Sequence, residues 1–359
     1  MPNYKDIPYH TNFLAGFSGL AGKPGGRVFW VGASGWTAVG GTSPSDGNNG
    51  LSPQTPFATI QKGLDACTSG RGDTVAVLPG SYTITAALTM SNDDVTLCSA
   101  APVGPREWSP VVITAAAAYD LNVIIINAND CKVRGITVEC GFAQVTASQE
   151  VVQVNNLATT TTIRGTVIEN CYFHMGRAAG AASAADTDLD CIRVGLASNP
   201  AVDTVIRGCV IYAYDEIAII TTAGSVNCLI QNNLIKDGVA SELGTGIQLA
   251  ATGGIVDGNT ILCGTTSDTV ACVAVNVAAA RAIVTHNTLV AWGADTCAIT
   301  IINTATLFST GNQILALAAG NEIDYKTDNT SPSMNSDFGQ LFNSTPPIAH
   351  FVTPTIAGS

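Results

Sequence analysis

The chain has 359 residues, of which 46% are hydrophobic and only 12% are charged, and its formal net charge is −12. Nucleic-acid binding depends on clustered Lys and Arg, which this sequence lacks, and the same acidic balance disfavours an anionic membrane surface. No apolar run is long enough to predict a membrane-spanning helix. The low charge and a mean hydropathy of +0.29 instead indicate that other subunits cover part of the outer surface.

Cysteine and histidine usage predicts neither a disulfide framework nor a metal site. The eleven cysteines are odd in number and show no paired spacing, and the four histidines are scattered. Cysteines inside strand-like segments, such as Cys171 and Cys209, are expected to fill the core as small hydrophobes. The first residues lack the basic-then-apolar build of a signal peptide, so we expect synthesis in the cytoplasm without one.

The two ends of the chain are predicted to be irregular arms. Residues 1–27 contain three prolines and five glycines with little periodic apolar content, and residues 326–359 contain four prolines among Ser, Thr and Asn. Between these arms, Val28–Val31 is predicted to be a strand. Residues 56–67 are predicted to form a short amphipathic helix, because Phe57, Ile60 and Leu64 share one stripe.

From residue 167 onward, one seven-residue phrase keeps returning. Later copies start at positions 205, 229, 255, 283 and 308, which are 24 to 28 residues apart. A period of this length is typical of a solenoid, and the β-branched, alternating phrase predicts strands in each coil. The copies are Val167–Phe173, Val205–Ile211, Leu229–Ile235, Ile255–Ile261, Ile283–Leu289 and Phe308–Ile314.

The fifth slot of the phrase indicates how the coils stack. It holds Asn233, Asn259, Asn287 and Asn312, and stacked asparagines can donate to one neighbour while accepting from the other. A second apolar strand follows in each period. The prediction is an all-β fold, a right-handed parallel β-helix over residues 28–325 with a short N-terminal capping helix and irregular terminal arms.

The start of the predicted solenoid carries the resemblance to a known family. The motifs are Asp46-Gly47, Leu51-Ser-Pro53, Thr55-Pro-Phe-Ala-Thr-Ile-Gln61, Gly72-Asp-Thr-Val75 and Pro79-Gly-Ser-Tyr82. In this order they resemble the opening of pectin-lyase-like right-handed parallel β-helix proteins. The resemblance implies that the helix plugs the first coil. It leaves the activity open, because lyases, hydrolases, epimerases and non-catalytic phage tailspike or virion proteins share this fold.

The candidate catalytic residues are acids placed before the second strand of successive coils. Counting back two residues from Ile192 and Ile217 gives Asp190 and Asp215, which are expected to stack; Asp188 and Glu216 flank them. Paired carboxylates across a groove are what glycoside hydrolysis requires. The alternative is that such residues cap turns through the backbone.

Other candidates concern binding rather than cleavage. Tyr212 and Tyr214 could stack on sugar rings or belong to a subunit interface. The turn Asp46-Gly-Asn-Asn-Gly50 carries oxygen ligands but does not match the spacing of a Ca²⁺-binding loop, so a plain turn is favoured. The Gly-His-Gly and Arg-Ile-Lys motifs of polygalacturonase-like family members are missing.

Two functional hypotheses remain. The favoured one is a bacteriophage virion structural protein, tailspike-like or capsid-decorating, made in the host cytoplasm and without a cofactor or metal. It would form a homo-oligomer, expected to be a side-by-side trimer, contact other virion proteins through its terminal arms, and have host polysaccharide as a candidate ligand. The alternative is a polysaccharide-cleaving hydrolase or lyase.

Overall fold

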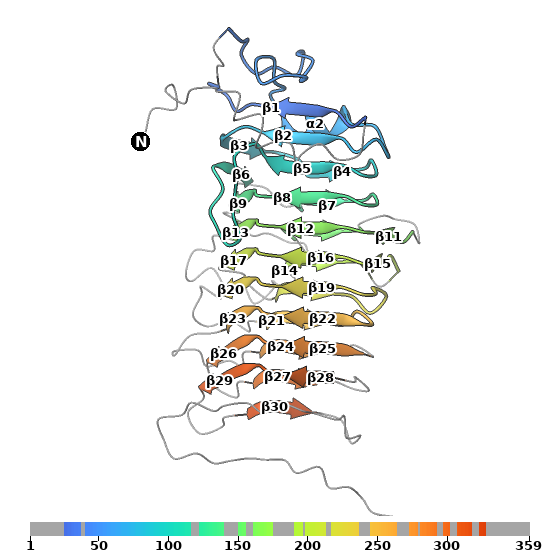
Figure 1. The fold of residues 1–359 in the computed structure, drawn as a ribbon, viewed down its shortest axis with the longest axis vertical. Helices are drawn as coiled ribbons and strands as arrows, with labels where there is room; N and C mark the ends of the chain where they lie inside the picture. Colours follow the sequence, from blue (N-terminus) through green and yellow to red (C-terminus); the bar gives the residue numbers. More distant parts are fainter. Residues whose placement is uncertain are drawn as a thin grey trace, which may run out of the picture.

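The structure is a computed structural model and shows a right-handed parallel β-helix, as the sequence predicts (Figure 1). It describes residues 25–36, 40–115, 122–139, 150–155, 161–174, 190–196, 198–212, 217–236, 245–263, 273–278, 281–292, 297–301, 307–317 and 323–327. Three sheets run along the solenoid. The first coil adds a strand to sheet A alone, and each later coil contributes one strand to each sheet in the order A, B, C. All pairs within the sheets are parallel, as in Val167↔Val205 and Phe173↔Ile211.

Sheet A has ten strands and sheets B and C have nine each. Sheet A contains β1 (Val28–Val31), β2 (Thr74–Val77), β5 (Thr96–Ser99), β8 (Lys132–Arg134), β12 (Val167–Glu169), β16 (Val205–Arg207), β19 (Leu229–Gln231), β22 (Gly254–Asp257), β25 (Ala282–Thr285) and β28 (Leu307–Thr310). Sheet B contains β3 (Gly80–Ile84), β6 (Val111–Ala115), β9 (Thr137–Glu139), β13 (Tyr172–His174), β17 (Val210–Tyr212), β20 (Leu234–Lys236), β23 (Thr260–Cys263), β26 (Thr288–Trp292) and β29 (Gln313–Leu317). Sheet C contains β4 (Leu88–Met90), β7 (Ile124–Ile126), β10 (Val152–Val154), β14 (Asp190–Val194), β18 (Ile217–Thr221), β21 (Thr245–Leu249), β24 (Val273–Val277), β27 (Cys297–Ile301) and β30 (Ile323–Thr327). A small additional sheet pairs β11 (Ile163–Arg164) with β15 (Ala201–Val202).

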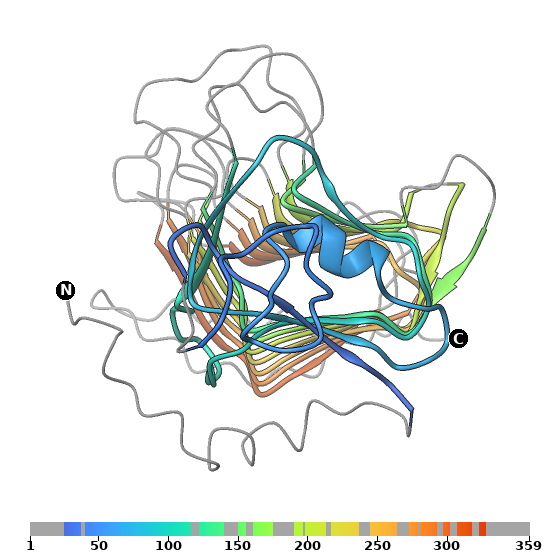
Figure 2. The ribbon, with the colours of Figure 1, turned by 90° about the horizontal axis from the view of Figure 1, so that it is seen from above.

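The N-terminal end of the solenoid is closed by helix α2 (Ile60–Asp65), which packs against β1, β2 and β4 (Figure 2). Ile60 and Leu64 are buried, and the helix begins after Thr59, whose hydroxyl accepts a hydrogen bond from the Lys62 N–H. The predicted helix over 56–67 is therefore confirmed, with a shorter extent. Residues 1–24 and 328–359 lie outside the described residues, and β30 carries the solenoid to Thr327.

A buried carboxylate fixes the chain beside this helix. Both oxygens of Asp73 accept hydrogen bonds from the Arg71 guanidinium at 2.6 Å, and they also accept from the backbone N–H groups of Arg27 and Thr68. Burial raises the pKa of Asp73, but these hydrogen bonds outweigh it and hold the pKa below its usual range. Asp73 therefore stabilises the fold in its ionised form.

Sheets A and B meet at a turn that the repeated phrase encodes. The fourth slot adopts positive φ, as in Gly208 (63°), Asn232 (55°) and His286 (54°), which glycine and asparagine accept at low cost. The fifth slot then points inward. Asn233 and Asn259 are both at most 1% exposed. The turn therefore forms the corner between sheets A and B, and in the coils of Asn233 and Asn259 it buries one side-chain amide.

The buried asparagines form the ladder that the sequence predicts, and the ladder has a direction. The Asn259 Oδ1 accepts from the backbone N–H of Asn233 at 2.9 Å and from its Nδ2 at 3.0 Å. The Asn259 Nδ2 donates back to the Ile230 carbonyl at 2.9 Å and forward to the Asn287 Oδ1 at 3.0 Å. Asn287 and Asn312 repeat these contacts. The Oδ1 atoms of Asn259, Asn287 and Asn312 thus each satisfy two donors of the preceding coil.

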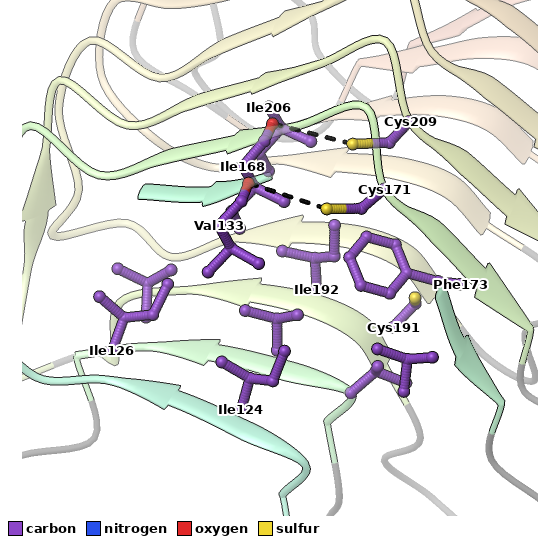
Figure 3. Packing of buried hydrophobic residues seen from close by; sticks show 14 of the residues in the cluster. Ile124, Ile126, Val133, Ile168, Cys171, Phe173, Cys191, Ile192, Ile206 and Cys209 are labelled. Carbon is purple, nitrogen blue, oxygen red and sulfur yellow. Dashed lines mark hydrogen bonds between the residues drawn. The ribbon is translucent and has the colours of Figure 1, made fainter. Parts of the chain in front are cut away.

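Cysteines occupy the same slot in the earlier coils. The Cys171 thiol lies 3.7 Å from the Val133 carbonyl, and the Cys209 thiol lies 3.7 Å from the Ile168 carbonyl (Figure 3). These carbonyls correspond to those that accept from asparagine amides in the later coils, so a weak thiol donor replaces the amide. Around the thiols, aliphatic side chains from all three sheets make one continuous core.

Candidate functional site

Asp190 is the only one of the four predicted catalytic acids that falls among the described residues. It begins β14 on sheet C, and its side chain is 1% exposed. The register pairs Asp190 with Ile217 and Ile192 with Ile219, so the predicted stacking of Asp190 on Asp215 is wrong. β18 has isoleucines at 217, 219 and 220, and an apolar run of this kind does not determine which residues of the strand face the core.

Asp190 belongs to an ion-pair triad that spans two coils. The Arg193 Nη2 lies 2.7 Å from the Asp190 Oδ2, and the Arg193 Nε lies 2.7 Å from an oxygen of Glu150, just before β10. Gln153 is the register partner of Arg193 and is 1% exposed. One guanidinium therefore compensates two largely buried carboxylates, which would be costly to bury without it. Asp188, Asp215 and Glu216 lie outside the described residues, and their catalytic role stays a prediction.

The glycan-binding candidate Tyr212 lies on a polar and aromatic column on sheet B. The register stacks Glu139, His174, Tyr212 and Lys236 on four successive coils. The His174 and Tyr212 rings have centroids 5.2 Å apart, and the Lys236 Nζ lies 5.6 Å from the centre of the Tyr212 ring. The ammonium and the ring therefore form a cation–π pair. Tyr214 lies outside the described residues.

A second aromatic pair lies beside this column. Trp108, at the end of the loop between sheets A and B, is 49% exposed, and its ring centroid is 4.8 Å from that of Tyr172. The pKa of Tyr172 is raised, chiefly by burial and to a smaller extent by the nearby Tyr212 and Glu139. Its phenol therefore stays protonated and can donate a hydrogen bond. Together, Trp108, Tyr172, His174, Tyr212 and Lys236 are called here the sheet B patch.

The loop that presents Trp108 is fixed at both sides of the tryptophan. The Arg106 guanidinium donates to the carbonyls of Asn232 and Asn233 at 3.0 and 3.1 Å. After the tryptophan, the buried Ser109 N–H donates to the Thr137 hydroxyl at 3.0 Å. The loop therefore crosses several coils (Figure 1), and the contact with Tyr172 places Trp108 on sheet B.

Sequence reasoning missed most of the sheet B patch, although a signal was present. Tyr172 occupies the sixth slot of the phrase, and His174 and Tyr212 both occupy the slot directly after the seventh. Aligning the copies one residue further would have stacked these two rings. No local signal, however, predicts that Trp108 reaches Tyr172.

The remaining candidates have structural roles. The Asp46 Oδ1 accepts from the backbone N–H groups of Ala58 and Thr59, and its Oδ2 accepts from the Thr59 hydroxyl. The turn interpretation of this segment is therefore confirmed, because Asp46 fixes the start of α2. Within the described ranges no group of acidic, histidine and cysteine side chains could hold a metal ion. No helix among them is long and apolar enough to cross a membrane.

Eight cysteines have described side chains, and all eight side chains are buried. Burial raises the pKa of Cys67, Cys98 and Cys228 to about 12 and that of Cys131 to about 11. Thiols with such values carry almost no thiolate at neutral pH and are poor nucleophiles. The predicted core-filling role is confirmed for these eight.

No protein-family pattern and no characterised protein sequence matches this chain. Solved structures with a similar fold include the alginate lyase of Paenibacillus sp. str. FPU-7, at 13% identity and a TM-score of 0.48, over 75% of this chain and 96% of the lyase. The pectin methylesterase of Aspergillus niger matches at 14% identity and a TM-score of 0.48, over 87% of this chain and 92% of the esterase. The enzymatically active domain of bacteriophage CBA120 tailspike protein 2 matches at 10% identity and a TM-score of 0.45, over 77% of this chain and 44% of the tailspike chain. Likenesses at this level concern the fold alone.

Proposed function

We propose that this chain is a bacteriophage virion structural protein, a homotrimeric β-helix that contacts glycans of the host surface through the sheet B patch. The observation that carries the proposal is the half-exposed Trp108, whose ring contacts Tyr172, on the same sheet as the neighbouring His174 and Tyr212 rings. Aromatic rings with a polar edge suit ligands that have both apolar and hydroxylated faces, as sugars do.

The chemistry of the patch and of Glu139, the register partner of His174, supports an oligosaccharide lying along the solenoid axis. Register partners on successive coils are about 4.8 Å apart, so Glu139, His174, Tyr212 and Lys236 span about 14 Å. Glu139 can accept hydrogen bonds from hydroxyl groups, and the Lys236 ammonium can donate them. Because these residues lie on strands of a continuous sheet, the site is preorganised and loses little conformational entropy on binding.

Glycan binding is tested by titrating the purified full chain against an array of bacterial surface polysaccharides. We expect Trp108→Ala and Tyr212→Ala each to weaken binding at least tenfold, which is about 1.4 kcal/mol. Leu51→Ala is the matched control, because Leu51 is also 49% exposed but lies near α2. Unchanged affinity in both patch variants would remove the patch from the proposal. Labelling of intact particles with an antibody against the chain tests the virion assignment separately.

The alternative function is polysaccharide cleavage at sheet C, where β14 begins. The observation that favours it is the pair of carboxylates, Glu150 and Asp190, held by Arg193 on adjacent coils. Incubation with the same polysaccharides would then release reducing ends. The enzyme would be favoured over the purely structural protein if Asp190→Asn abolished this cleavage while Trp108→Ala left it intact.

A further inference from the structure

Every second coil between β8 and β28 has a glycine at the corner where sheet A passes into sheet B. The reason is steric, because a Cβ at Gly208 would lie 2.5 Å from the Asn170 Oδ1, and a Cβ at Gly258 would lie 2.6 Å from the Asn232 Oδ1. A polar side chain in one coil therefore requires a glycine in the next. The corner residues of positive φ are, in order, Gly135, Asn170, Gly208, Asn232, Gly258, His286 and Gly311.

The chain itself occupies the first part of this corner. Residues 100–109, called here the strap, connect β5 to β6 and run down beside the coils before they return (Figure 1). A Cβ at Gly135 would lie 3.2 Å from the Val103 side chain, and a Cβ at Gly208 would lie 3.2 Å from the Pro105 side chain. The strap therefore packs on two consecutive corner glycines.

Backbone carbonyls at the corner hold the tip of the strap. The Arg106 N–H donates to the Gly208 carbonyl at 2.8 Å, and its guanidinium donates to the carbonyls of Asn232 and Asn233 at 3.0 and 3.1 Å. The Asn233 carbonyl also accepts the Thr260 N–H, so it serves the coil stack and the strap together. The unit that the strap binds is thus a corner glycine followed, one coil later, by two consecutive carbonyls.

The same unit recurs two coils further along the solenoid, beyond the strap. Gly258 is its corner glycine, and His286 and Asn287, on the next coil, supply the two consecutive carbonyls. Among the described residues, only the Asn232 side chain lies within 4 Å of a Cβ at Gly258. None of the described residues donates to the Gly258 or His286 carbonyl, while the Asn287 carbonyl accepts the Gln313 N–H in the stack.

The surroundings of this second unit favour a segment that is cationic and partly apolar. Burial raises the pKa of Asp257, directly before Gly258, but hydrogen bonds from His286 and two neighbouring side chains outweigh it and hold the pKa below its usual range. An ionised carboxylate and partially negative carbonyls therefore attract a cation. On the face of sheet A beside the corner, Ile283 and Phe308 are 39% and 51% exposed, and they offer an apolar surface.

We propose that the corner unit of Gly258, His286 and Asn287 is a docking site for an arginine-bearing segment of another protein. The segment packs a proline or a small apolar residue against Gly258 and places its guanidinium on the two carbonyls. Pro105 and Arg106 make these same contacts one unit earlier within the chain.

The chemistry of the contact selects arginine and excludes the two arms as its source. A guanidinium is a planar fork that donates to two acceptors at once, whereas the lysine ammonium is a compact point charge. Neither residues 1–24 nor residues 328–359 contain an arginine. The inference does not depend on glycan binding, because no residue of the sheet B patch belongs to this unit.

Titration of the full chain with a synthetic peptide of residues 101–107, with both ends blocked, tests the site. Amide chemical shifts of the deuterated protein show where the peptide binds. We expect shifts at Gly258 and His286, and an affinity roughly tenfold lower for the peptide in which glutamine replaces the arginine. Equal affinity of the two peptides, or shifts confined to Gly208 and Asn232 under the strap, would overturn the proposal.

Matched variants of the chain locate the contact. Gly258→Ala should weaken binding of the arginine peptide roughly tenfold, whereas Gly70→Ala should not, because Gly70 also has positive φ but has no neighbour within 4 Å of a Cβ. His286→Lys puts a resident cation beside the carbonyls and should weaken binding by repulsion. His286→Asn reproduces the unit that Arg106 binds and should retain it. Thermal unfolding shows that each variant is folded.

Two outcomes of these titrations contradict the assignment. Affinity that both Gly258→Ala and His286→Lys leave unchanged would remove the corner unit from the contact. Peptide binding that is seen only after deletion of residues 1–24 or 328–359 would show that an arm of the chain fills the unit, and no other protein is then required.

Discussion

Because the hydrogen bonds of the asparagine ladder all run in one direction, replacing different asparagines should cost different amounts of stability. In Asn259→Leu, the Asn233 backbone N–H and one hydrogen of its Nδ2 lose the acceptor that bonds them at 2.9 and 3.0 Å. A buried donor without a partner costs about 1–3 kcal/mol, so two donors cost about 2–6 kcal/mol. In Asn233→Leu only the Cys209 N–H loses its acceptor, at 2.9 Å, and the expected cost is about 1–3 kcal/mol.

The polarity corrects an expectation drawn from symmetry. In a symmetric stack, replacing a terminal rung such as Asn312 would deprive one neighbour only, so it would cost less than replacing Asn259. In the structure, however, the Asn312 Oδ1 accepts both the backbone N–H and the Nδ2 of Asn287, at 2.9 Å each. Asn312→Leu should therefore cost as much as Asn259→Leu, and the less costly rung is Asn233 at the other end.

Urea denaturation of the three leucine variants beside the parent measures these differences. The same substitution is made at every rung, so the change in side-chain size contributes similarly, and the comparison isolates the donors left without acceptors. Amide exchange at Asn233 and Asn287 reports the same loss locally. Equal losses for Asn233→Leu and Asn259→Leu, or losses below about 0.5 kcal/mol for both, would refute the assigned polarity of the ladder.

Three further predictions follow from single contacts. Arg106→Ala should lower the free energy of unfolding by about 1–2 kcal/mol, since two hydrogen bonds from a cation are lost, and limited proteolysis should then cut residues 100–109 faster; unchanged cleavage would contradict the anchoring role. Gly258→Ala should destabilise more than Gly70→Ala, because both residues have positive φ but only at Gly258 would the new Cβ lie 2.6 Å from an oxygen of Asn232; thermal unfolding of the pair measures the difference. The pKa of Asp73 is held below its usual range, so the stability that Asp73 contributes is complete above about pH 4 and is lost as pH falls through its folded-state pKa. In acid titrations, Asp73→Asn should therefore lose stability less steeply than the parent. Parallel stability curves for the two proteins would contradict the assignment.

Local sequence determined the repeating part of this protein. Within seven residues the phrase contains a strand, a turn residue of positive φ, a buried amide and a second strand. Equivalent residues stack because each coil pairs in register with the next. The phrase around Asn259 therefore predicted the solenoid, its A–B corner and the ladder. The capping helix was equally legible, because Phe57, Ile60 and Leu64 share one apolar stripe and Thr59 is a suitable N-cap residue.

Only the tertiary structure decided the phase of sheet C and the path of the long loop. Three isoleucines in β18 satisfy the core in more than one register, so counting along the chain paired Asp190 with the wrong neighbour. Arg106 reaches carbonyls 126 and 127 residues away, and no local pattern encodes where such a loop lands. Periodic contacts repeat a local rule and are readable from the sequence, whereas the surfaces that carry function arise where residues distant in the chain meet on the outside of the stack.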